Sequence, residues 1–178
     1  MKNEKKLQLI VILYLFGVAV LGRFIFMIPD KQYLNILNIN DFYVTSCALL
    51  LIITLFIFLV TKASIRKKTL SSIVASLIIF TCFTVYFYSN LPTYTYELAV
   101  KKVEEAEKHA NKNVQIQIPI YREDKLGVTK ASFLSMTNYM YYVYLKVDGM
   151  PVAYKFNPMD GQYEKLPGGK ELADYTVQ

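Results

Sequence analysis

The chain has 178 residues, of which 54% are hydrophobic, and a formal net charge of +6. This composition is too apolar for one average soluble domain, yet not apolar enough for a chain that lies wholly in a membrane. Residues 1–89 carry nine Lys and Arg against three Asp and Glu, whereas residues 90–178 carry eleven of each. This positive excess flanks apolar runs, so we expect it to mark membrane topology. A nucleic-acid-binding protein would carry the excess on its soluble domain, so we exclude that class of function.

Three apolar runs in the first half predict membrane-spanning helices. They cover residues 7–28, 42–60 and 70–88. Runs of this length cross a hydrocarbon core of about 30 Å as helices. A cleaved signal peptide is the alternative for the first run, but that run is long and lacks a small-x-small cleavage site. The sequence therefore predicts a membrane domain over residues 1–90, with the bilayer as its first partner.

Cations in the connections between these runs predict the orientation of the chain. The N-terminal tail has three lysines, residues 30–41 have one cation, and residues 61–69 have four. Loops rich in Lys and Arg stay in the cytoplasm. We therefore expect a multi-pass protein of the cell membrane with a cytoplasmic N-terminus and an extracytoplasmic domain over residues 91–178.

Arg23 lies inside the first predicted span. An ionisable residue at this depth is a candidate for an intramembrane functional charge, such as part of an ion path. The other interpretation is local, because Arg23 lies six residues before Pro29 and its long side chain can extend to the outer headgroups, towards Asp30. We favour the local interpretation and keep the functional one as a candidate.

The second half begins with a predicted amphipathic helix. Apolar residues recur at helical spacing from Glu97 to Ala110, and charged residues occupy the other positions. Thr93 or Thr95 is the expected N-cap. We expect the charged side of this helix to face solvent.

The rest of this half predicts antiparallel strands. The expected strands are residues 114–120, 139–147, 152–156 and 163–166. Pro119 predicts an edge strand or a bulge, and Asp148-Gly149 predicts a hairpin turn. Residues 122–130 are expected to form a loop, residues 131–137 a loop or a short strand, and residues after 169 a loose tail. The fold class is three transmembrane helices followed by an α+β domain, one helix on a three- to four-stranded antiparallel sheet.

Alternation along residues 139–147 separates the strand into two faces. Tyr142, Tyr144 and Lys146 share the less apolar face. We expect these three residues to be a candidate binding surface. The interpretation that we favour is that the tyrosines are simply well-packed strand residues, because aromatic side chains favour strands.

The second half resembles the PepSY-like domains of bacterial membrane and secreted proteins. The resemblance lies in the alanine-rich helix 97–110, the run Tyr-Val-Tyr-Leu-Lys-Val-Asp-Gly at 142–149, and residues 152–163. The family often has an aromatic-x-Val strand, a glycine turn and a strand that ends in Asp-x-x-Thr-Gly. Here Gly161 matches, whereas Asn157 replaces the Asp and Asp160 the Thr. The resemblance implies a non-catalytic module that binds or restrains peptidases or other envelope proteins.

Residues that carry catalysis or bind metals are scarce. His109 is the single histidine, and it lies among charged residues near the end of the predicted helix. Cys47 and Cys82 lie in apolar runs without metal-ligand spacing. The chain has no HExxH motif and no glycine-rich phosphate loop. We therefore expect no catalytic residues, no metal and no cofactor.

Three hypotheses of function follow. The first is a non-enzymatic membrane protein whose extracytoplasmic domain binds or regulates an envelope protein or peptide. The alternative is a subunit of a transporter or multi-protein membrane complex that acts through its transmembrane helices. The third is a membrane enzyme with an unrecognised site, for which His109 would be the only imidazole.

Overall fold

The computed structural model describes residues 2–110, 113–130, 132–167 and 175–177. The chain divides into two compact units, which are described one at a time below. The first comprises Met1–Pro29 and Asn38–Asn90, and the second comprises Asp30–Leu37 and Leu91–Gln178. The second unit thus contains the predicted domain together with a short segment from between the first two helices.

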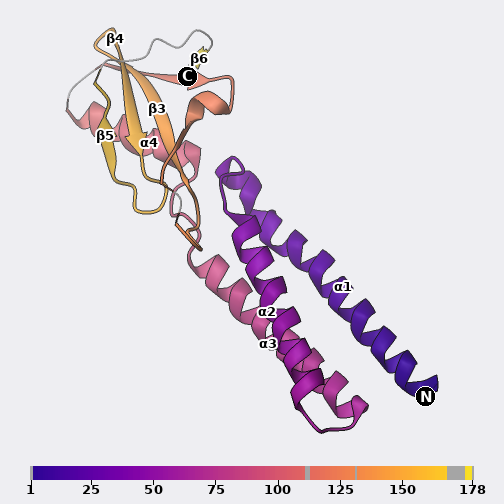
Figure 1. Cartoon of the computed structure of the whole chain (residues 1–178). Coiled ribbons are helices and arrows are strands. Elements are labelled where there is room, and N and C mark those ends of the chain that lie inside the picture. The colour runs from indigo at the N-terminus through magenta and orange to yellow at the C-terminus, as the bar shows by residue number, and fades with distance from the viewer. Residues whose placement is uncertain (1, 111–112, 131, 168–174, 178) are drawn as a thin grey trace. The chain divides into compact units, whose positions relative to one another are not determined.

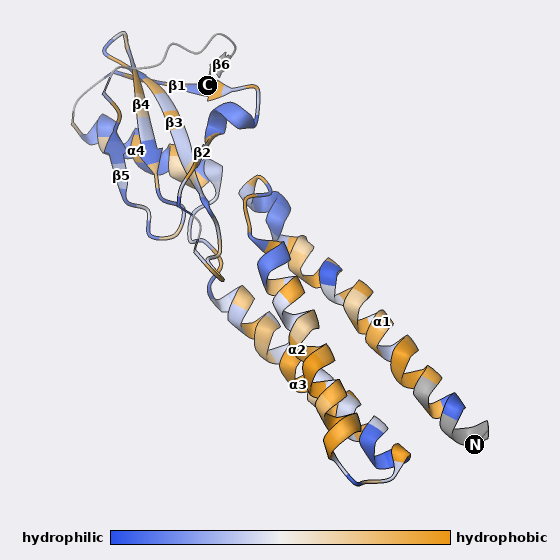
Figure 2. Cartoon of the chain, in the orientation of Figure 1, coloured by the Kyte–Doolittle hydropathy of each residue, from blue (hydrophilic) through white to orange (hydrophobic). Residues whose placement is uncertain are grey.

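The first unit consists of three long helices, α1 (Lys2–Asp30), α2 (Ile39–Val60) and α3 (Ile65–Ser89). Each is long and apolar enough to cross a membrane, and Figure 2 shows the hydrophobic colour along all three. The three predicted spans are therefore confirmed as helices. Each helix is longer than its apolar run, because neighbouring polar residues continue the helical backbone at one or both ends.

One phenylalanine from each helix forms an aromatic contact inside the first unit. Phe26, Phe42 and Phe87 are all fully buried. The ring of Phe87 meets the rings of Phe26 and Phe42 edge to face, with centroids 4.9 Å and 5.1 Å apart. Such pairs are favourable beyond the area that they bury. Packing of this kind matters in a membrane, where apolar burial alone does not hold helices together.

Small polar side chains of α3 face inwards in the same unit. Ser72 and Ser76 are buried, and Ser76 Oγ donates a hydrogen bond to Tyr14 Oη at 3.1 Å. Small residues let helix backbones approach, and a hydroxyl needs a partner away from water. The first unit therefore packs through small residues and aromatic rings.

Among its described residues the second unit has one α-helix, α4 (Tyr96–His109), which lies across one face of an antiparallel sheet, as Figure 1 shows. The 3-10 helix η1 (Lys31–Tyr33) also belongs to this unit. Thr95 caps the helix by accepting a hydrogen bond from the Leu98 amide, as the sequence predicts. The main strands are β1 (Val114–Pro119), β3 (Tyr139–Val147), β4 (Met150–Phe156) and β5 (Tyr163–Lys165). The expected fold class is confirmed.

Two short strands were not expected. β2 (Leu126–Val128) pairs with β3 beside β1, and β6 (Tyr175–Val177) pairs with β1. Among the described residues the sheet has six strands, in the order β5-β4-β3-β1-β6, with β2 off this path. Residues 122–130 are therefore not a plain loop, since they also contain the short helix η2 (Glu123–Lys125). Part of the expected loose tail, residues 170–174 and 178, lies outside the described residues.

Pro119 fits the sheet in a different way from the one expected. β1 is not an edge strand, because β6 lies beside it. However, β1 pairs with β3 only from Val114 to Gln117, so Pro119 pairs on one side alone, with Tyr175 of β6. A proline in this position removes no hydrogen bond from the β1–β3 ladder.

The turns follow the sequence pattern. Asp148 and Gly149 have positive φ angles of 51° and 84° and join β3 to β4 as a two-residue hairpin loop. Two positive φ angles match the twist of a β-hairpin. Residues 131–137, for which a short strand was an option, contain no strand in the described part; Thr137 makes only an isolated bridge.

The segment Asp30–Leu37 is part of the core of the second unit. Ile36 is 1% exposed and packs in one cluster with α4, β3 and β4. Arg122 donates from Nε to the Leu34 carbonyl at 2.6 Å and from Nη2 to the Asn35 carbonyl at 2.9 Å. Tyr33 Oη donates to the Pro92 carbonyl at 2.9 Å. A segment before α2 thus completes a domain that otherwise begins at Leu91.

We expect Ile36→Ala to lower the free energy of unfolding of this unit by about 2–4 kcal/mol, because it leaves a cavity in a closed core. Near-UV circular dichroism during denaturant unfolding of the detergent-solubilised full chain measures the change. Met150→Ala is the control, since Met150 is 67% exposed, and it should change the value by no more than about 0.5 kcal/mol. Equal effects of the two substitutions would contradict the assignment of Ile36 to the core.

Candidate functional site

The candidate site is the face of the sheet that α4 does not cover. Along β3 the residues Tyr141, Val143, Leu145 and Val147 enter the core with α4. Tyr142 and Tyr144 therefore lie on the opposite face, where they pack with Ala153 of β4 and with Leu166. The structure brings the two predicted tyrosines together on this face.

The burial on this face agrees with the favoured interpretation of the sequence, that the tyrosines are well-packed strand residues. Tyr144 is only 5% exposed, and Tyr142 and Lys146 are half-buried. The hydroxyl of Tyr144 donates to the backbone carbonyl of Asp124 at 3.1 Å, which ties η2 to the sheet. η2 therefore contacts the tyrosine face, and β2, which follows it, pairs with β3 in the sheet itself.

Gly127 in β2 allows the ring of Tyr142 to lie directly against the β2 backbone. A Cβ atom at position 127 would lie 2.5 Å from Cζ of Tyr142, closer than real Cβ contacts occur. Glycine in a strand often marks a place where another group comes near the backbone. Any side chain at position 127 would displace either Tyr142 or β2.

A groove of about 600 Å³ remains on this face. It is lined by Glu123, Asp124, Leu126, Tyr142, Tyr144, Ala153, Leu166 and Pro167. Two carboxylates stand on one side, and aromatic and aliphatic side chains form the rest. Such a surface suits a ligand that has an apolar part and a positive charge.

Lys146 lies apart from this groove. It lines a second hollow of about 370 Å³ with Asn113, Val114, Gln115 and Gly149, near the β3–β4 turn. The three residues predicted as one surface thus lie at two places on the same face of β3. In the groove, the charge next to the tyrosines is negative and comes from η2.

Burial affects several tyrosines of the second unit. It raises the pKa of Tyr144, and it raises the pKa of Tyr96, Tyr141 and Tyr154 far above the usual value of about 10. The neutral phenol is therefore the form that the fold favours. The stability contributed by these groups is complete below about pH 10 and is lost as the pH rises through the raised values.

Two of these phenols differ in their hydrogen bonds. Tyr154 Oη donates to Glu107 Oε1 at 2.7 Å and so connects β4 to α4. The hydroxyl of Tyr141 is buried and has no hydrogen-bond partner among the described residues. A buried polar group without a partner costs stability, whereas a bond to a carboxylate contributes to it.

Arg23, the other candidate residue, lies in the first unit. Its guanidinium carbon is 5.9 Å from the ring centroid of Tyr43 in α2, within cation–π range. Asp30, towards which we expected the side chain to extend, accepts a hydrogen bond from the Leu37 amide at 2.9 Å. The geometry thus gives Arg23 an aromatic neighbour on the next helix.

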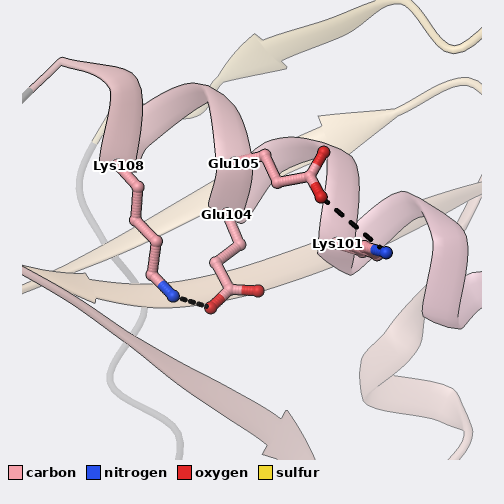
Figure 3. A network of polar contacts seen from close by, with 4 residues as sticks. All are labelled: Lys101, Glu104, Glu105 and Lys108. Atoms are coloured by element: carbon pink, nitrogen blue, oxygen red, sulfur yellow. Dashed lines mark hydrogen bonds and ion pairs between the residues drawn. The ribbon is translucent and has the colours of Figure 1, made fainter.

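The outer side of α4 carries paired charges. Figure 3 shows Lys108 with Glu104 and Lys101 with Glu105, at 2.6 Å and 3.8 Å. Exposed pairs four residues apart contribute only about 0.3–0.5 kcal/mol each. His109 at the end of α4 is exposed. Each pair joins opposite charges and so stabilises the helix itself. We therefore do not assign the candidate site to these residues.

The part of the site that comes from η2 and β2 was not predicted from the sequence. The sequence signal for β2 was the run Leu126-Gly127-Val128 inside an otherwise polar segment. A run of three residues is too short to show the period of two that indicates a strand. Among the described residues, no three His, Cys, Asp or Glu side chains form a group that could hold a metal ion.

Comparisons of the chain with protein-family models, with curated proteins and with solved structures find no match. The PepSY resemblance therefore stays a prediction, and the function has to be argued from the site itself.

We expect Tyr141→Phe and Tyr154→Phe to affect stability differently, although both remove one hydroxyl. Tyr141→Phe should leave the free energy of unfolding unchanged or raise it by up to about 1 kcal/mol, because it removes an unpaired buried group. Tyr154→Phe should lower it by about 1–2 kcal/mol, because it breaks the bond to Glu107. Denaturant unfolding of the two variants measures this. A loss above about 1 kcal/mol for Tyr141→Phe would show that its hydroxyl has a partner.

Proposed function

We propose that this chain is a non-enzymatic integral membrane protein whose second unit, a PepSY-like domain outside the cytoplasm, binds an extended peptide segment of an envelope protein. The observation that carries the proposal is the groove on the tyrosine face, with carboxylates on one side and apolar side chains on the other. Regulation of the bound protein would follow from occupancy of this groove.

The floor of the groove supports an apolar contact. Tyr142, Tyr144 and Ala153 belong to the two central, longest strands, so their backbones are fixed by pairing on β3 and β4. The hydrogen bond from Tyr144 to Asp124 also fixes the ring of Tyr144. Rigid aromatic side chains bind a partner at low cost in conformational entropy, and tyrosine is frequent at such sites.

The acidic side of the groove supports a preference for cationic segments. Glu123 is exposed at the mouth, and Asp124 is next to it on η2. A lysine or arginine in the ligand would meet these carboxylates while a neighbouring apolar side chain meets the tyrosines. Complementary charge at such a rim favours the correct partner and speeds its association.

The placement outside the cytoplasm is supported by the cations between α2 and α3. The connection contains Lys62, and the first turn of α3 adds Arg66, Lys67 and Lys68. If each helix crosses the bilayer, the segment Asp30–Leu37 and the chain after Leu91 are on the same side, because two crossings separate them. This agrees with their presence in one folded unit.

We expect peptides selected from a random seven-residue display library on the purified full chain to carry Lys or Arg next to an aromatic or aliphatic residue. The double substitution Glu123→Lys and Asp124→Lys should weaken their binding at least tenfold, which is about 1.4 kcal/mol. Fluorescence anisotropy of labelled peptides measures the affinity. The change reverses the charge of the groove without removing the tyrosines.

Glu105→Lys is the control, because Glu105 is a carboxylate on the outer side of α4 with a side chain 58% exposed. It should leave the affinity within about twofold. An equal loss for both variants would indicate non-specific attraction to a charged surface and contradict the groove as the binding site.

The location is tested with single cysteines at two exposed positions, Met150→Cys in the second unit and Arg66→Cys at the start of α3, in a chain with Cys47 and Cys82 replaced by alanine. We expect a membrane-impermeant thiol reagent to label position 150 in intact cells and to label position 66 only after lysis. Labelling of position 66 alone in intact cells would reverse the proposed topology.

A further inference from the structure

Four exposed apolar side chains lie in three neighbouring segments of the second unit, and we call them the apolar rim. Ile120 is 58% exposed, Tyr121 57%, Val128 78% and Phe133 77%. Single exposed apolar residues are ordinary on a protein surface. Four large exposed apolar side chains in one region of the surface indicate an interaction site.

The strand register places the rim at one end of the sheet. Val128 pairs with Tyr139, the first residue of β3. β1 runs antiparallel to β3, from the pair Val114–Val147 to the pair Gln117–Tyr144, so Ile120 lies beyond the last pair and near the start of β3. Phe133 belongs to the turn that connects β2 to β3. All four side chains thus belong to the end of the sheet where β3 begins.

The turn that carries Phe133 is well defined by hydrogen bonds. The Ser135 amide donates to the Ser132 carbonyl at 3.2 Å, and Ser135 Oγ donates to Asn138 Oδ1 at 2.8 Å. Phe133 and Leu134 are the two central residues, and Leu134 has a φ of 56°, which is uncommon for leucine. These hydrogen bonds define the turn, and Phe133 within it is exposed.

The chain connects this end of the sheet to α2 through very few residues. Thr137 forms a bridge with Leu37, and α2 begins at Ile39, which is at most about 7 Å of chain away. Arg122, next to Tyr121, donates to the carbonyls of Leu34 and Asn35 in the same connection. Both sides of the rim are therefore tied to the segment that joins α1 to α2, two helices apolar enough to cross a membrane.

We infer that the apolar rim contacts the bilayer, with Phe133 and Val128 among the acyl chains just below the headgroups of the leaflet next to the domain. Aromatic residues favour this depth. Lys130, between Val128 and Phe133 in the sequence, is placed to meet lipid phosphates. The rim would restrain the domain at the membrane surface, independently of the peptide groove on the sheet face.

Tryptophan fluorescence tests this inference, because the natural chain has no tryptophan. The full chain with Phe133→Trp is reconstituted into phosphatidylcholine and phosphatidylglycerol vesicles whose acyl chains are brominated near the headgroup. Met150→Trp is the matched control, because Met150 is also exposed, at 67%. Met150 pairs with the last residue of β3, whereas the rim lies at the first, and a nine-residue strand is about 30 Å long. We expect brominated lipid to quench the emission of the Phe133→Trp chain at least twofold more than that of the Met150→Trp chain.

A second reporter, Val128→Trp, protects the test against a folding defect at position 133. Quenching by brominated lipid at both rim positions, together with protection from aqueous iodide, supports the inference. Quenching equal to that at position 150 overturns it. Protection from iodide without quenching by lipid also overturns it, because a protein surface would then cover the rim.

Discussion

The second unit depends on one constraint, the inclusion of Asp30–Leu37 in its core. Ile36 packs in the core with α4 and the sheet. Arg122 donates hydrogen bonds to the carbonyls of Leu34 and Asn35, the two residues before Ile36. This segment is covalently continuous with α1 and α2, so the domain is connected to the membrane helices at three points of the chain.

The two proposed surfaces lie at different places on the sheet. The rim belongs to the end where β3 begins, and the groove lies on the face opposite α4. The segment from Ile120 to Val128 contributes to both, because it carries two rim residues at its start, the acidic residues of the groove in η2, and Val128 at its end.

Local patterns were sufficient for most elements. Apolar length predicted α1, α2 and α3, a cap at Thr93 or Thr95 predicted the start of α4, and Asp148-Gly149 predicted the hairpin, because each signal acts over a few neighbouring residues. The short strands β2 and β6 escaped prediction because three residues carry too little periodicity. Tyr142 and Tyr144 were placed on the correct face of β3, since alternation alone decides that. Packing of these tyrosines was one of the two interpretations of the sequence, but the segment that covers them was not predictable, because Asp124 of η2 reaches Tyr144 from 20 residues earlier in the chain.

The sequence by itself determined three membrane helices, an α+β domain after them, and the separation of β3 into a core face and a tyrosine face. These follow from hydrophobic length, from period and from turn residues, which are local properties. Only the tertiary structure decided that Ile36 belongs to the core of the second unit, that Asp124 holds Tyr144, and that Ile120, Val128 and Phe133 lie at one end of the sheet. Contacts between residues that are distant in the chain depend on strand register and side-chain packing, and no short stretch of sequence contains that information.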